Sequence, residues 1–189
     1  MSRNDLRLPF EMWSELFFQG VEDVLGTQAL AGLMRAPGEQ GTASLLLSLP
    51  QQYGERTAQG IAVRAGRAAL RHLLRRRADA LGLGAMEFWL LPPRRRLSQG
   101  LRALMDGWEN APAHWLALGE DEHTWQVQIR GGLFASADPA HLGCWFLSGL
   151  LQEFLSWAGG ARVYPLRALT CTSSPEGACQ MVLAREPLD

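Results

Sequence analysis

The chain has 189 residues, a formal net charge of −1, and 18 basic residues that are all arginine. The absence of lysine excludes a Schiff-base lysine, a pyridoxal anchor and a P-loop lysine. A hydrophobic content of 47% over this length predicts one folded domain, residues 1–189, with a core of its own. The polar first residues lack a signal-peptide core, and no apolar run is long enough to span a membrane. We therefore expect a cytoplasmic protein with reduced thiols.

Helical periodicity dominates the first half of the chain. Apolar residues recur at spacings of three and four between Phe10 and Leu25, and a second short helix is expected from Thr27 to Met34, before Pro37 and Gly38. A long helix is predicted over residues 51–77. These segments predict a layer of helices ahead of the rest of the domain.

Two glycines, Gly60 and Gly66, interrupt this long predicted helix, and each costs about 1 kcal/mol relative to alanine. Interior glycines and alanines are explained if another backbone passes close by, either in a tight helix crossing or in a dimer contact. They are explained equally well by a weak helix that its core tolerates. The sequence leaves both interpretations open.

The second half of the chain predicts strands around one further helix. Between Thr124 and Arg130, apolar and polar residues alternate, which is typical of a half-buried strand. The other predicted elements are a strand over Met86–Leu91, a helix over 99–108, a strand over His114–Leu118, a helix from Asp138 to about Ala158, and a hairpin of 162–172 with 178–184. This order predicts an α+β fold in which N-terminal helices pack on a mostly antiparallel sheet.

Three cysteines are placed so that they can meet. Cys171 and Cys179 flank the final turn, and Cys144 lies on the preceding helix. Three converging thiols would supply three of the four ligands of a structural zinc site, with His141 as one candidate for the fourth. The alternative is that all three are buried as small hydrophobic residues.

Arginines cluster between residues 55 and 102, a segment that contains eleven arginines and only three acidic residues. Arg64, Arg67 and Arg71 share one helix face, which could bind a ligand carboxylate or the acidic groups of a partner. The alternative is a solvated face. No nucleic-acid recognition motif accompanies the cluster, so we expect no nucleic-acid partner.

Bulky rings in the second half of the chain could line an apolar ligand cavity, although ordinary core packing is the commoner use of such residues. The candidates are Trp89, Trp125, Trp145 and Phe146. The four histidines lack metalloprotease spacing, and neither a nucleophile elbow nor a dinucleotide-binding motif is present. Nothing in the sequence therefore demands an enzyme.

Three segments, taken together, resemble a known family. They are Tyr53-Gly54 with Gly60-Ile61 and Arg64 to Ala68, then Gly143-Cys144 to Leu155, then Gly160 to Tyr164 with Cys171, Gly177 and Cys179. In this order they are similar to the 4-vinyl reductase, or hydrocarbon-binding, domain family. The resemblance extends from about Glu11 to Ala184.

This resemblance implies a dimer-prone fold related to the TRAPP trafficking-complex subunits, with residues 1–50 as a helical extension and 51–186 as the family-like core. It also implies zinc bound by three cysteines and a glutamate, with the thiols at Cys144, Cys171 and Cys179. Ala168 stands where relatives have the glutamate, so His141, water or a ligand would complete the set.

The function that the resemblance implies is a sensory domain for a hydrophobic or aromatic small molecule, acting through a partner protein and as a homodimer. The expected ligand-binding residues are Trp89, Trp125, Trp145, Phe146, Arg64 and Arg67. One alternative is an accessory factor or reductase in tetrapyrrole and bacteriochlorophyll metabolism. Another is a ligand-free dimeric interaction scaffold.

Overall fold

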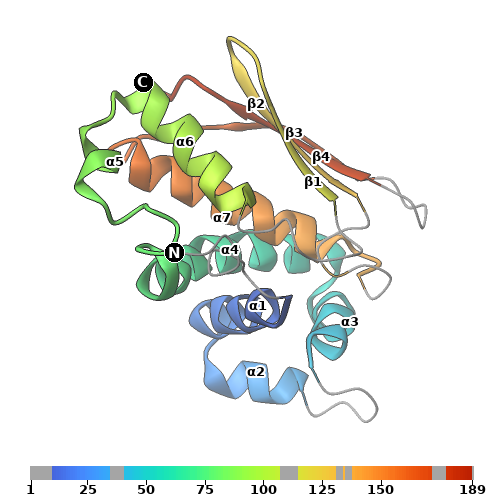
Figure 1. Cartoon of the computed structure of the whole chain (residues 1–189). Helices are drawn as coiled ribbons and strands as arrows, with labels where there is room; N and C mark the ends of the chain where they lie inside the picture. The colour runs from blue at the N-terminus through green and yellow to red at the C-terminus, as the bar shows by residue number, and fades with distance from the viewer. Residues whose placement is uncertain are drawn as a thin grey trace.

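The computed structural model describes residues 10–34, 41–106, 115–130, 134, 138–171 and 178–188 (Figure 1). Helices come first, and strands surround one last helix. In chain order the elements are α1 (Phe10–Leu25), α2 (Thr27–Leu33), α3 (Thr42–Tyr53), α4 (Glu55–Arg77), α5 (Met86–Leu90), α6 (Pro93–Asp106), β1 (Trp115–Glu120), β2 (Thr124–Arg130), α7 (Leu142–Ala158), β3 (Leu166–Cys171) and β4 (Ala178–Ala184). Among the described residues, no helix is both long and apolar enough to cross a membrane.

The helices stack in layers in which α4 lies between α1 and α7 (Figure 1). Glycines permit the close approach. A Cβ at Gly66 would overlap the carbonyl oxygen of Phe146 on α7 and come within 2.8 Å of the Leu150 backbone nitrogen. Conversely, a Cβ at Gly149 would overlap the carbonyl oxygen of Val63 on α4. The tight-crossing interpretation is therefore confirmed at Gly66, whereas Gly60 faces open space.

The four strands form one antiparallel sheet in the order β1-β2-β4-β3, and α6 and α7 lie against one of its faces (Figure 1). The alternation predicted for β2 is confirmed, because Trp125, Val127 and Ile129 are buried while Gln126 is exposed. On β4, the neighbouring strand, Cys179, Met181 and Leu183 are buried in the same way. The α+β class with helices and an antiparallel sheet is thus confirmed.

Several predicted elements differ from the structure. The helices predicted to start at residue 99 and at Asp138 begin instead at Pro93 and Leu142. Residues 86–90 form the short helix α5 instead of a strand, because the extended Ala85 before it and Pro92-Pro93 after it leave room for little more than one turn. The predicted helix over 51–77 is divided at Gly54, whose φ of 79° only glycine adopts readily, and the preceding residues belong to α3. Expected features at Pro37, Gly38, 107–108, His114, Thr172 and Gly177 lie outside the described residues.

Candidate functional site

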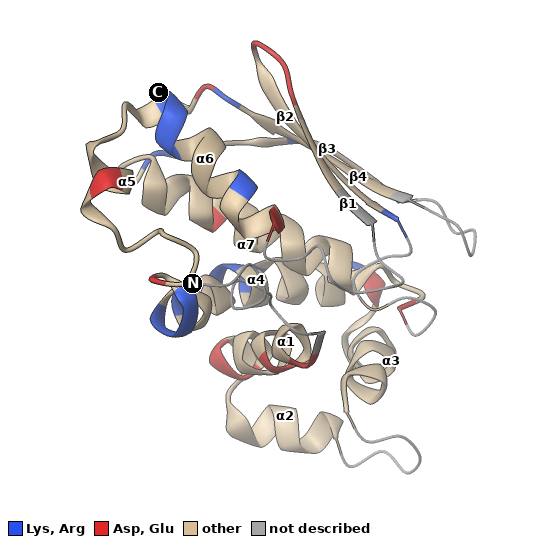
Figure 2. Ribbon diagram, in the orientation of Figure 1, with Lys and Arg blue, Asp and Glu red and all other residues tan. Residues whose placement is uncertain are grey.

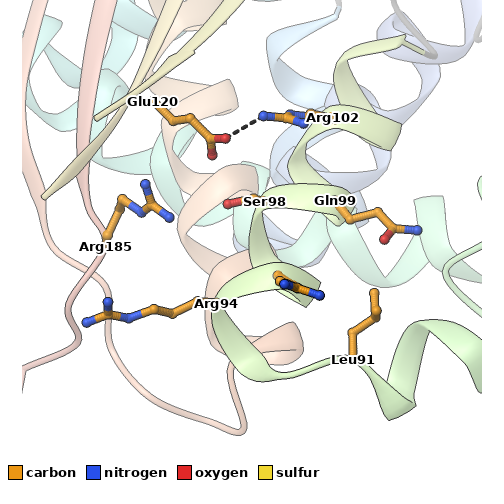
Figure 3. Close-up of a pocket in the computed structure, with 8 residues that line it drawn as sticks. Leu91, Arg94, Ser98, Gln99, Arg102, Glu120 and Arg185 are labelled. Carbon is orange, nitrogen blue, oxygen red and sulfur yellow. Dashed lines mark hydrogen bonds and ion pairs between the residues drawn. The ribbon is translucent and has the colours of Figure 1, made fainter. Parts of the chain in front are cut away.

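A groove of about 480 Å³, lined mainly by polar and charged residues, lies between α6 and one end of the sheet (Figure 3). Its lining residues are Leu91, Arg94, Arg95, Ser98, Gln99, Arg102, Glu120 and Arg185. Most of them come from α6, whose opposite face is apolar and is buried through Leu97, Leu101 and Leu104. Helical spacing therefore places the polar residues of α6 together on the open side.

Positive charge dominates this groove, because four arginines face one carboxylate, that of Glu120. Arg102 forms an ion pair with Glu120, and Arg94 lies 3.7 Å from Glu186 just outside the lining. Arg95 has no hydrogen-bond or ion-pair partner within the described ranges. The groove thus holds more guanidinium groups than the acids around it neutralise, which favours an anion.

Arg185 is held in place by the turn between β1 and β2. Its guanidinium donates a hydrogen bond to the carbonyl oxygen of Asp121 and lies 5.5 Å from the ring centroid of Trp125. The Trp125 indole N–H in turn donates to the Ser98 hydroxyl at 3.2 Å. These contacts connect the turn, the sheet and α6 around one side of the groove.

The Asp121 carboxylate organises the same turn. It accepts hydrogen bonds from the Thr124 hydroxyl at 2.7 Å and from the backbone N–H groups of His123 and Thr124 at 2.8 and 2.7 Å. The hydroxyl bond, followed by the two backbone bonds, lowers the pKa of Asp121 to about 2. All of these bonds favour the ionised form of the carboxyl group.

We expect a carboxyl NMR titration to give a pKa for Asp121 near 2, whereas an unperturbed aspartate titrates at 3.8. Because the folded pKa is depressed, the stabilising contribution is complete above pH 3.8 and is lost as the pH falls toward 2. The Asp121→Asn variant should lose this pH dependence. A measured pKa close to 3.8 would contradict the turn geometry.

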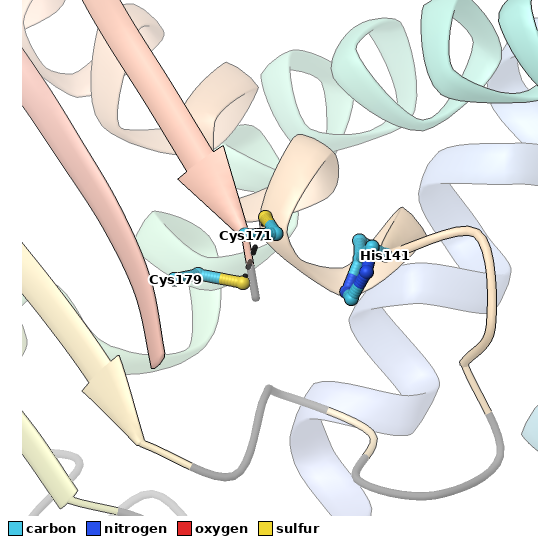
Figure 4. Close-up of side chains that lie close together, drawn as sticks. All are labelled: His141, Cys171 and Cys179. Carbon is cyan, nitrogen blue, oxygen red and sulfur yellow. Dashed lines mark hydrogen bonds between the residues drawn. The ribbon is translucent and has the colours of Figure 1, made fainter. Parts of the chain in front are cut away.

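A second cluster joins the start of α7 to the end of the sheet (Figure 4). Cys144 and Cys179 form a disulfide, and the Cys171 sulfur lies 2.9 Å from that of Cys179. His141, Cys171 and Cys179 have their potential ligand atoms within 4.8 Å of one another. The three cysteines do meet, but two of them are bonded where the sequence predicted free thiols.

The free thiol of this cluster, that of Cys171, is a weaker acid than an ordinary cysteine thiol. Burial, with the nearby Asp138 carboxylate second, raises the pKa of Cys171 to about 11. Asp138 accepts hydrogen bonds from the backbone N–H groups of Leu142 and Gly143, each at 2.7 Å, and so caps the first turn of α7. At neutral pH, Cys171 is therefore protonated and is a poor metal ligand or nucleophile.

None of the four aromatic residues expected to line a cavity is among the residues that line the groove. Trp125 is buried beside the groove, and Phe146 is buried with its ring centroid 5.3 Å from that of Phe17. Trp145 is half-buried against the core on α7. Trp89 is 40% exposed on α5.

The predicted arginine face on α4 contributes no residue to the groove. Arg67 donates a hydrogen bond to Gln152 on α7 at 3.2 Å, and Arg71 pairs with Asp23 on α1 at 3.0 Å. Arg64 is exposed on α4 and is absent from the groove lining.

Sequence reasoning missed Arg102 and Arg185 as groove residues. Starting α6 at Pro93, a favourable first helical position, would have shown that residues 95, 98, 99 and 102 share a face.

Searches of protein-family models and of curated proteins find no match. Among solved structures, this fold is similar to that of an Fe(II) unliganded H-NOX protein from K. algicida, with a TM-score of 0.57, 12% identity, and coverage of 94% of this chain and 97% of the other. A substituted Tt H-NOX gives a TM-score of 0.53 and 9% identity over 93% of this chain and 94% of the other. At these identities the likeness establishes a shared fold.

The resemblance to the 4-vinyl reductase and TRAPP proteins is therefore corrected, because the structures that share this fold are H-NOX proteins. The misleading motifs have a physical explanation. The glycines at positions 66 and 149 are where the backbones of α4 and α7 meet, so they report a helix crossing and not a family.

The expectation of zinc is also corrected. The similar structures are iron-containing H-NOX proteins and not zinc proteins. In this chain the disulfide leaves Cys171 as the one free thiol of the three cysteines. A closed structural zinc site requires thiolates, which a disulfide does not provide.

Proposed function

We propose that this chain is a small-molecule-binding sensory domain whose ligand is an organic anion, bound in the arginine-lined groove. The observation that carries the proposal is the excess of guanidinium groups over carboxylates in an open groove of about 480 Å³, a volume suited to a small ligand. Guanidinium groups bind carboxylates and phosphates bidentately, which provides orientation as well as attraction. The fold shared with H-NOX proteins supports a sensory role.

The H-NOX neighbours point to haem as the group that this fold can hold. Haem iron needs a histidine, cysteine, methionine or tyrosine as an axial ligand, and the groove lining contains none of these. Of the described histidines, His72 on α4 bonds to Asp23 on α1 at 2.8 Å, His123 is exposed in the turn between β1 and β2, and His141 lies beside the cysteine cluster. The described residues thus fit haem poorly, and we assign the groove to a different ligand.

The ion pair between Arg102 and Glu120 provides a way for ligand binding to change the surface that a partner protein contacts. A ligand carboxylate that binds Arg102 competes with Glu120, which ends β1. Binding would therefore release the end of an edge strand, where a protein partner could detect the change. The protein partner and the homodimer stay predictions, and sedimentation of the purified chain would test the homodimer.

We expect Arg102→Ala to weaken anion binding about 10- to 100-fold, as loss of a charged hydrogen bond generally does. Isothermal titration with mono-, di- and tricarboxylates and with inorganic phosphate measures the effect. Arg64→Ala is the matched control, because it removes an exposed arginine outside the groove. If wild type binds no anion in the millimolar range, or if both variants lose binding equally, the groove is not the site.

A further inference from the structure

Most of the large apolar side chains that the described structure exposes lie at one end of the molecule. They are Met86 (74% exposed), Trp89 (40%), Leu90 (77%), Val163 (58%) and Leu188 (60%). We call this surface the apolar end. It consists of α5, the start of α6, the segment after α7 and the chain's C-terminal residues (Figure 1).

Direct contacts hold these segments together. The Trp89 and Trp157 rings pack edge to face with centroids 4.8 Å apart. Arg96 donates hydrogen bonds to the carbonyl oxygens of Ala158 at 2.7 Å and Trp89 at 3.1 Å, so it fastens α5 to the end of α7. The backbone N–H of Leu188 donates to the carbonyl oxygen of Val163 at 2.8 Å. Arg94 also lies 3.7 Å from Glu186, so the start of α6 is joined to the C-terminal segment as well.

Arginines slightly outnumber acidic residues around this surface. Arg94, Arg95 and Arg162 are exposed around it, against the acids Glu87 and Glu186. Figure 2 shows the basic start of α6 next to the C-terminus, whereas the acidic residues of α1 lie on a different part of the molecule. Because the whole chain is slightly acidic, this local basic excess results from segregation of charge.

The shape of the apolar end distinguishes between a partner helix and a bilayer as the surface that it binds. Met86 and Leu90 are about three-quarters exposed, so they project from the short helix α5 and do not line a groove. A partner helix requires a groove, whereas projecting apolar side chains can enter the soft boundary of a bilayer. Tryptophan and arginine are also favourable at that boundary, where anionic headgroups attract basic residues.

We propose that the apolar end docks on the surface of a membrane containing anionic lipids, with Met86 and Leu90 inserted and the neighbouring arginines against the headgroups. This inference shares Arg94 and Arg95 with the groove, but it does not require the groove to bind an anion. It adds a place of action to the domain, at the surface of a bilayer and not across it.

Flotation with phosphatidylcholine vesicles, with and without phosphatidylserine, tests the proposal. Wild type should float with the anionic vesicles and dissociate as salt is raised. The double variant Met86→Asp with Leu90→Asp should bind at least about tenfold more weakly, since two charges replace the inserted groups. Leu47→Asp is the matched control, because Leu47 is 41% exposed on α3, away from this end, and should leave flotation unchanged.

A second variant, Arg95→Glu, reverses a charge without changing the apolar groups and should also reduce flotation. Arg102→Ala should float as wild type does, which separates this result from failure of the anion groove. The proposal is overturned if wild type does not float with anionic vesicles, or if Leu47→Asp is as impaired as the double variant. It is also overturned if sedimentation shows a dimer that Met86→Asp with Leu90→Asp dissociates, because a second copy would then occupy this end.

Discussion

Replacing Gly66 by alanine should lower the free energy of unfolding by about 3 kcal/mol or more, the upper range for overpacking. The added Cβ would overlap the carbonyl oxygen of Phe146 and approach the backbone nitrogen of Leu150 to 2.8 Å. Both atoms are α7 backbone, so relief requires separating two helices that pack along their length, unlike a clash with a flexible side chain. Urea unfolding followed by circular dichroism measures the change as a lower midpoint at similar slope.

Gly60→Ala is the matched control in the same helix. Gly60 is exposed and has open space where its Cβ would stand. The substitution should therefore raise the free energy of unfolding by about 0.5–1 kcal/mol through helix propensity alone. Equal effects at the two positions would contradict the close crossing of α4 and α7.

The same crossing shows how far the sequence could lead. Glycine at position 66 and the small residues around it were explained equally well by a close backbone neighbour and by a weak helix, and they did not identify the neighbour. The partner, α7, is about 80 residues further along the chain, and only the three-dimensional structure pairs them. The alternation of Trp125, Val127 and Ile129 is a local signal, and it correctly predicted both the strand and its buried face.

Prediction failed where the same local sequence pattern is compatible with two different structures. The run at Met86–Leu91, which two prolines follow, was predicted to be a strand, but residues 86–90 form the short helix α5. The structure leaves Met86 and Leu90 exposed and buries Phe88. The groove was missed for a different reason, since Arg185 and Glu120 join α6 only through tertiary packing. The cysteine cluster was predictable from hairpin pairing, but the choice of Cys144 as the partner of Cys179 was not.

Loss of the Cys144–Cys179 disulfide should lower the free energy of unfolding by about 3–4 kcal/mol under oxidising conditions. The two cysteines are separated by 35 residues, so the bond restricts a long loop of the unfolded chain. Cys144→Ala alone is an incomplete test, because Cys171 lies 2.9 Å from Cys179 and could replace the lost partner. The double variant Cys144→Ala with Cys171→Ala removes that route, and urea unfolding without reductant measures its stability.

Cys171→Ala is the control, because it keeps the disulfide and removes only a half-buried thiol, at a cost of about 1 kcal/mol. Dithiothreitol should bring wild type close to the double variant. If reductant leaves wild type unchanged, or if Cys171→Ala matches the double variant, the bond does not stabilise the fold.

Exchange within the cluster should be slow at neutral pH, because the raised pKa of Cys171, about 11, keeps that thiol protonated. Rearrangement to a Cys171–Cys179 disulfide should therefore become faster as the pH approaches that pKa. Peptide mapping over time measures the rate.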